Sequence, residues 1–180
     1  FYHSGDEWSG VPIMSSNMDT TGTFDMHEEL SPHGMVTCIA RHHNRDGKLW
    51  IQAKRRAYLC VMSGISNKEI SEILAVENTI PDVAFVGLDV ANGYTINFVE
   101  SIKRLILHLP HATIIAGNVV TADMTAEVIL AGADIVKVGI GGGSVCTTRI
   151  KTGVGYPQLS AVIECADAAH GIGGHIIADG

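Results

Sequence analysis

The sequence predicts an α/β protein that folds as a (β/α)8 (TIM) barrel. Short, β-branched apolar runs alternate with helical patterns along the whole chain, and the runs are apolar nearly throughout rather than at every second position. Such runs are typical of parallel strands that are covered on both faces. Seven runs favour the closed barrel, with an open doubly wound sheet as the alternative. The runs are Val11–Ser16, Met35–Ile39, Tyr58–Ser63, Val83–Val90, Ala112–Gly117, Asp134–Ile140 and His175–Ala178.

The chain is short for a complete barrel. Such a fold needs eight strands and usually about 250 residues, whereas this chain has 180 and its last run ends two residues before Gly180. We therefore expect residues 1–180 to form a single partial barrel domain that lacks the eighth strand and material at both ends.

The helical segments between the runs carry start and stop signals. Ser66 and Glu69 have the spacing of a capping box. An apolar stripe from Phe98 to Leu109 predicts a helix that Pro110 ends. The other signals are Thr121 as a cap, Gly132 just past a helix end, Pro157 at a first helical position and Gly171 at a helix end.

Composition and charge narrow the classes of partner. A formal charge of −7 and the absence of a basic stripe argue against a nucleic-acid binder. We expect the one basic cluster, Lys54–Arg56, to be a solvated helix face. No apolar run reaches the roughly 20 residues that span a bilayer, so we expect no membrane association. Four cysteines without a CxxC pair indicate a reducing compartment, and we expect a cytoplasmic protein.

Polar residues repeatedly follow the apolar runs, at what would be one rim of the barrel. Catalytic groups in such barrels lie at the carboxyl ends of the strands. The segments in question are Asn17–Thr20, Arg41–His43, Gly64, Asp89–Tyr94, Asn118, Gly141–Arg149 and Asp179–Gly180.

The loop after the sixth run is the richest of these segments. Its three consecutive glycines let main-chain amides or carbonyls approach a phosphate or a cation. Cys146 lies there among hydroxyl-bearing residues, and Arg149 is a nearby source of positive charge that would favour a thiolate. The residues alone leave a nucleophile and an inert thiol about equally supported.

Three segments resemble the IMP dehydrogenase/GMP reductase family. They are Gly139–Arg149 (GIGGGSVCTTR), Asn17–Thr20 (NMDT) and Ala116–Val119 (AGNV). Two further segments, Asp89–Tyr94 (DVANGY) and Lys151–Ser160 (KTGVGYPQLS), are similar to the GMP reductase branch. The dehydrogenase branch usually carries a regulatory CBS insert between early barrel strands, and we expect none here, because none fits between His43 and Tyr58.

The resemblance implies a usually tetrameric barrel enzyme that converts GMP to IMP and ammonia with NADPH, in purine nucleotide salvage. Cys146 falls on the nucleophile that forms a covalent thioimidate at purine C2, and Thr148 on a group that transfers a proton to the departing ammonia. The partner of Thr148, a glutamate, would lie beyond residue 180.

The resemblance also implies ligand contacts. Those to NADPH involve Asp89, Val90, Ala91, Ile140, Gly141 and Arg41. Those to the nucleotide involve Ser144, Asp179, Gly180 and Met18. A monovalent cation, K+, is implied at Gly141, Gly143, Cys146 and Arg149.

Two residues depart from the family pattern. Gly142 stands where a proline is usual, which predicts a less rigid loop. Arg41 stands where a lysine that helps bind NADPH is usual, and arginine keeps the charge but changes the geometry. Two other functions stay open at this point, an NAD-dependent IMP dehydrogenase and a non-catalytic nucleotide-binding barrel.

Overall fold

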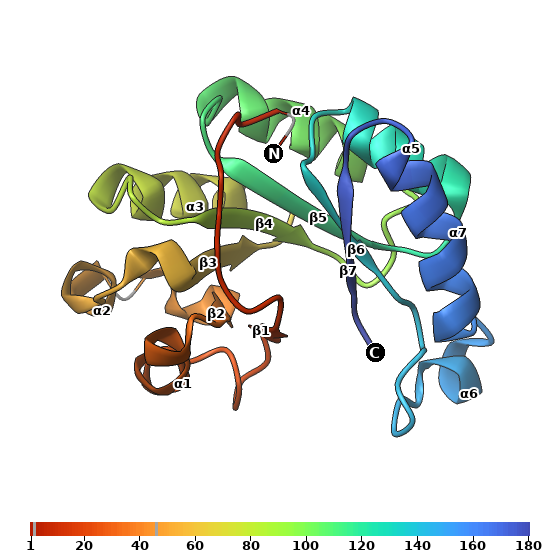
Figure 1. Ribbon diagram of the computed structural model, residues 1–180, viewed down its shortest axis with the longest axis horizontal. Helices are drawn as coiled ribbons and strands as arrows, with labels where there is room; N and C mark the ends of the chain where they lie inside the picture. The colour runs from red at the N-terminus through yellow and green to blue at the C-terminus, as the bar shows by residue number, and fades with distance from the viewer. Residues whose placement is uncertain (2, 46) are drawn as a thin grey trace. The chain divides into compact units, whose positions relative to one another are not determined.

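The computed structural model describes residues 1, 3–45 and 47–180, which form two compact units. The β1–β4 unit comprises Asp6–Leu88, and the β5–β7 unit combines Phe1–Gly5 with Asp89–Gly180. Within each unit, parallel strands alternate with helices and neighbouring strands follow one another in sequence (Figure 1). A doubly wound sheet would reverse its strand order, and neither unit does. The predicted fold class, a (β/α)8 barrel represented by seven of its strands, is confirmed.

The β1–β4 unit is built around short buried strands. In the parallel ladder, Cys38 of β2 lies opposite Cys60 of β3, and Val61 of β3 lies opposite Val86 of β4. Every residue of β2 is buried, and so is every residue of β3. The strands are β1 (Met14–Ser15), β2 (Val36–Ile39), β3 (Leu59–Ser63) and β4 (Phe85–Asp89). The helices are α1 (Phe24–Leu30), η1 (Ser31–His33), η2 (Arg41–Arg45), α2 (Gly47–Gln52), η3 (Arg56–Tyr58) and α3 (Asn67–Thr79).

Helix α2, which the sequence patterns do not predict, is held by one aromatic side chain. Trp50 is fully buried, and its ring centroid lies 4.9 Å from that of Phe24 in an edge-to-face arrangement. Its indole Nε1–H donates to the main-chain O of His43 at 3.0 Å. Tertiary packing therefore stabilises a helix that is too short to be stable alone.

The capping box predicted at α3 is present. Ser66 Oγ accepts from the Glu69 amide, and the Glu69 carboxylate accepts from the Ser66 amide at 3.2 Å. Arg41 Nη1 lies 2.9 Å from the same carboxylate. Partial burial would raise the pKa of Glu69, but the bonds from Ser66 and the charge of Arg41 outweigh it and lower that pKa.

The β5–β7 unit contains the glycine-rich segment Gly141–Arg149 and most of the residues predicted to bind ligands. Helices α5 and α7 lie against each other, and α7 also packs on β7 (Figure 1). The strands are β5 (Thr113–Val119), β6 (Ile135–Val138) and β7 (His175–Ala178). The helices are α4 (Ile96–His108), α5 (Ala122–Leu130), α6 (Thr148–Thr152) and α7 (Gln158–His170).

The first residues of the chain are attached to this unit through Asp134. The Asp134 side chain is buried, and its Oδ1 accepts from the His3 amide at 2.7 Å and from the Ser4 amide at 3.3 Å. Its Oδ2 accepts from the Ile114 amide at 3.2 Å. Three amide donors offset the cost of burying this carboxylate at the amino end of β6.

Several predicted boundaries need correction. The run Val11–Ser16 contributes only the two paired residues of β1, because ladder pairing is confined to Met14 and Ser15. The strand expected at Ala112–Gly117 continues to Val119, which places Asn118 inside β5 rather than after it. The strands expected at Val83–Val90 and Asp134–Ile140 are shorter at both ends.

Two predicted helix starts also differ. Pro157 has an extended ψ of 125° and is the N-cap of α7, so Gln158 is the first helical residue. Thr121 is the N-cap of α5 but its side chain caps nothing, because its Oγ1 lies 3.0 Å from the Tyr94 hydroxyl. Gly132, with a φ of +118°, ends α5 as predicted.

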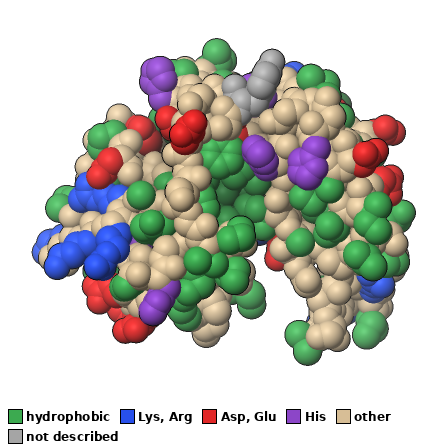
Figure 2. Space-filling model, in the orientation of Figure 1, with side chains coloured by type: hydrophobic (Ala, Val, Ile, Leu, Met, Phe, Trp, Pro, Cys, Tyr) green, Lys and Arg blue, Asp and Glu red, His purple; other side chains and the backbone are tan. Residues whose placement is uncertain are grey.

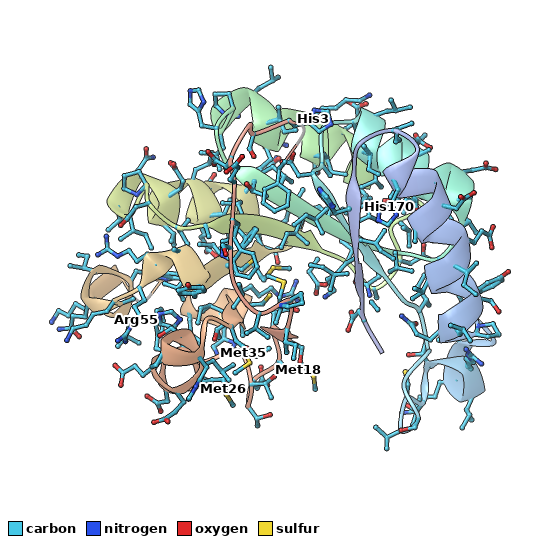
Figure 3. All side chains as sticks on the ribbon, in the orientation of Figure 1. His3, Met18, Met26, Met35, Arg55 and His170 are labelled. Carbon is cyan, nitrogen blue, oxygen red and sulfur yellow. The ribbon has the colours of Figure 1, made fainter. Side chains whose placement is uncertain are left out.

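The cluster Lys54–Arg56 does not form one helix face, which corrects the prediction, since only Arg56 is helical, as the first residue of η3. It follows the end of α2, and Arg55 has a φ of +50°. Arg56 is instead paired with Asp82 at 2.9 Å. Basic side chains gather over this part of the unit in Figure 2, and Figure 3 labels Arg55. In the part of the chain that the structure describes, no helix is long and apolar enough to cross a membrane.

Candidate active site

The candidate active site lies in the β5–β7 unit, on the loop that joins β6 to α6. Two of its glycines have a positive φ, which residues with a side chain rarely adopt. They are Gly139, with a φ of +149°, and Gly141, with a φ of +67°. A Cβ on Gly139 would overlap the main-chain O of Asp179, so this glycine lets the end of β7 approach the loop. Gly142 has no positive φ, and nothing in its backbone conformation requires glycine.

Cys146 is the only exposed cysteine of the four. Its amide donates to the Gly143 carbonyl at 3.0 Å, which closes a tight turn at the tip of the loop. Its Sγ lies 3.2 Å from Thr148 Oγ1. Hydrogen bonding from the side chain and the main chain of Thr148 lowers the pKa of the Cys146 thiol. Exposure and a favoured thiolate both fit a nucleophile better than an inert thiol.

Arg149 contributes less to this thiolate than the sequence suggested. Its guanidinium donates to the main-chain O of Tyr156, which ties α6 to the segment that follows it. Its positive charge lowers the pKa of Cys146 only as a minor contribution beside the bonds from Thr148. The Tyr156 amide in turn donates to the Ile140 carbonyl at 3.0 Å, so the loop is closed at its base.

A network of charged and polar side chains lies next to the base of this loop. Lys137 Nζ is 2.6 Å from Asp89 Oδ1 and 3.2 Å from Asp179 Oδ2. Asn118 Nδ2 donates to Asp179 Oδ2 and to the Gly139 carbonyl, both at 2.7 Å. All four of these residues, Asp89 included, belong to the β5–β7 unit, and they lie at or near strand ends.

Lys137 is a charged group in a mostly buried setting. Its side chain is 12% exposed. Burial by itself would lower the pKa of Lys137, but the carboxylates of Asp89 and Asp179 outweigh that effect and raise it. The ammonium group therefore stays protonated at neutral pH.

Lys137 and Asn118 were not predicted as site residues. Asn118 was recognised only as a polar residue near a strand end. Lys137 carried one signal in the sequence: it is the single charged residue within the apolar strand Ile135–Val138. A lysine in such a strand indicates a buried partner of opposite charge, although the sequence does not say which.

The remaining predicted residues fall into two groups. Val90, Ala91, Ser144 and Gly180 lie in the β5–β7 unit with the network. The Val90 amide donates to Gly117 O at 2.8 Å, and Ser144 is exposed. Met18 and Arg41 belong to the β1–β4 unit, where Met18 follows β1 and is 62% exposed (Figure 3). Arg41 is bound there to Glu69.

Side chains suited to a transition metal are not gathered anywhere in the described residues, since no three of His, Cys, Asp or Glu converge. The loop offers main-chain carbonyls instead. The Gly143 carbonyl accepts from Cys146 and the Arg149 carbonyl from Gly153, each at 3.0 Å. Each carbonyl oxygen has a second lone pair.

Comparison with known proteins gives consistent matches. Residues 9–180 match the family model described as "IMP dehydrogenase / GMP reductase domain". All of the chain aligns with a GMP reductase of Phytophthora infestans at 51% identity, and with one of Klebsiella pneumoniae at 52%. It also aligns throughout with human GMP reductase 1 at 51% identity. The chain spans about half the length of these curated relatives, between 51% and 53%.

Proposed function

Because the chain belongs to the IMP dehydrogenase/GMP reductase family, we propose that it carries the catalytic cysteine of an NADPH-dependent GMP reductase. The reaction would convert GMP to IMP and ammonia, a step of purine nucleotide salvage. The observation that carries the proposal is the exposed Cys146 thiol, 3.2 Å from the Thr148 hydroxyl on the glycine-rich loop. The names of the three relatives favour the reductase over the dehydrogenase.

Cys146 would act as the nucleophile. Its thiolate attacks purine C2, the amino group leaves as ammonia after protonation, and a thioimidate joins Sγ to C2. Reduction at C2 and release of the thiolate then give IMP. Thr148 stabilises the thiolate before attack and afterwards lies within reach to pass a proton to the departing amino group.

The nucleotide would be held by the loop and by the end of β7. Asp179 has a carboxylate suited to ribose hydroxyls, and the backbone of Gly180 lies beside Gly143. Ser144 presents an exposed hydroxyl for the phosphate. Met18, exposed in the β1–β4 unit, would contact the nucleotide as well.

NADPH, when bound, supplies the hydride that reduces C2. The residues present fit this cofactor, because the Asp89 carboxylate is 31% exposed at the end of β4 and can accept from ribose hydroxyls. The exposed Ala91 follows Asp89 by two residues. The further contacts would come from Val90, Ile140, Gly141 and Arg41.

A monovalent cation, K+, would bind the carbonyl oxygens of the loop. Main-chain carbonyls are the ligands that replace the hydration shell of K+ in proteins, and those of Gly141, Gly143, Cys146 and Arg149 are of this kind. The cation would hold the Cys146 turn in place. We also propose that the protein is a cytoplasmic homotetramer, since four free cysteines suit a reducing compartment.

The test follows NADPH absorbance when the complete protein is incubated with GMP. We expect NADPH oxidation by the parent and none by Cys146→Ala, with Cys165→Ala as a control that removes a buried thiol. No oxidation by the parent would contradict the proposal. Reduction of NAD with IMP would identify the dehydrogenase instead, and GMP binding without turnover a non-catalytic barrel.

A further inference from the structure

Lys137 joins the two carboxylates that the proposed function assigns to different ligands. It projects from β6 and lies 2.6 Å from Asp89 and 3.2 Å from Asp179. Asp89 would contact the cofactor and Asp179 the nucleotide. One ammonium group thus contacts a residue of each proposed binding site.

The contacts of Asp179 leave one of its oxygens for a ligand. Lys137 and Asn118 both bind Oδ2, at 3.2 and 2.7 Å. Within the described residues, no hydrogen bond reaches Oδ1. When two donors hold one oxygen of a carboxylate, the direction of the other oxygen is fixed. The two donors thus orient a ligand-binding group without touching the ligand themselves.

A buried lysine is costly unless its charge is paired. Lys137 is nearly buried, and two carboxylates share it, so its position depends on both of them. A change at one carboxylate is expected to move the ammonium group toward the other. The two proposed binding sites therefore share a single side chain.

We propose that Lys137 is a positioning residue that orients Asp179 toward the nucleotide and Asp89 toward the cofactor, and that it couples the two sites. The inference rests on the proposed function. A purely structural ion pair would make a different prediction: its loss would lower stability and leave ligand affinity unchanged.

The test measures the dissociation constant of GMP by calorimetry on the complete protein, without cofactor. We expect Lys137→Met to weaken GMP binding about 10- to 100-fold, the range found when groups that support metal ligands are lost. Lys137→Arg keeps the charge and should recover part of the affinity. Lys103→Met is the matched control, because Lys103 is exposed on α4 and pairs with Glu100 in the same helix.

Asp89→Asn tests the coupling between the two sites. It still tests the proposal if Lys137→Met does not fold. With Asp89 neutral, the ammonium group shifts onto Asp179 and competes with ribose hydroxyls, so GMP affinity should fall several-fold although no cofactor is present. Parent-like GMP affinity in Asp89→Asn, or in a folded Lys137→Met, would overturn the inference.

NADPH oxidation by the parent distinguishes a failure of the role proposed for Lys137 from a failure of the proposed function. A parent that turns over GMP while these variants bind GMP normally contradicts only the role of Lys137. A parent that neither binds GMP nor oxidises NADPH overturns the proposed function and this inference together.

Discussion

At the scale of single residues, Cys146 differs from the other cysteines in its surroundings. Cys38, Cys60 and Cys165 are buried, and burial raises the pKa of Cys165. Cys146 is exposed, and the bonds from Thr148 lower the pKa of its thiol. The pKa of Cys146 is thus lower than that of an ordinary cysteine and the pKa of Cys165 is higher. Of the four thiols, only that of Cys146 is exposed to a substrate.

Alkylation kinetics should report this difference. The thiolate is the reacting form, so a lowered pKa places the midpoint of the rate of iodoacetamide labelling against pH below the ordinary value of 9.0. Thr148→Val should move that midpoint upward and slow labelling at neutral pH. Cys146→Ser is the control and should remove the fast-reacting thiol. Identical midpoints in parent and Thr148→Val would contradict the assigned role of Thr148.

At the scale of elements, the ends of helices and strands place the polar groups. The capping box starts α3 one residue after Ser66, and Gly132 ends α5 in a conformation that disfavours other residues. Gly139 lets the end of β7 approach the loop after β6. At Gly139, the local chemistry at the end of a strand therefore determines how closely Asp179 approaches the loop after β6.

The capping box gives a prediction for Ser66→Ala. We expect the free energy of unfolding to fall by about 1 kcal/mol at neutral pH, as for other lost N-caps. The pKa of Glu69 in the folded protein lies below its ordinary value of 4.5. The stabilisation that the ionised Glu69 contributes is therefore fully present above pH 4.5 and is lost as the pH falls through the folded pKa. The difference between parent and variant should therefore narrow in acid.

Urea unfolding at neutral and acidic pH measures this effect. Ser71→Ala is a matched control on the same helix, since the Ser71 hydroxyl donates to the Asn67 carbonyl one turn earlier at 2.9 Å and caps no helix end. A loss in Ser71→Ala as large as that in Ser66→Ala would show that the cap is not the cause.

At the scale of the whole molecule, the two units differ in what they contribute. The β5–β7 unit contains Cys146, Thr148 and the network around Lys137. The β1–β4 unit supplies Met18 and Arg41, and its Arg41 is bound to Glu69 at the start of α3. The predicted catalytic groups thus belong to the β5–β7 unit, whereas the predicted ligand contacts are divided between the two units.

Ligand binding should stabilise the complete protein. A ligand that binds only the folded state at about 100 times its Kd adds about 2.7 kcal/mol, so we expect GMP to raise Tm in a concentration-dependent way. Asp179→Asn replaces the negative carboxylate proposed to bind the ribose with a neutral amide that has a single acceptor oxygen, and it should reduce the shift. An equal rise in Tm for that variant would argue against Asp179 as a nucleotide contact.

The predictions from sequence succeeded where the signal is local. Apolar runs and capping residues predicted the strands and α3, α4, α5 and α7, because periodicity and caps act over a few residues. The short helices α1, α2 and α6 were missed. Trp50 shows why for α2: the helix depends on a ring contact with Phe24, which no local pattern encodes.

The sequence by itself determined the alternation of strands and helices and the glycine-rich loop with Cys146 and Thr148, since these residues are neighbours in the chain. Only the tertiary structure decided which charges meet. Lys137 and Asp89 are 48 residues apart and Asn118 and Asp179 are 61 apart, and parallel strands bring them together at their carboxyl ends. A buried lysine must be paired, but its partners follow from the arrangement of the strands.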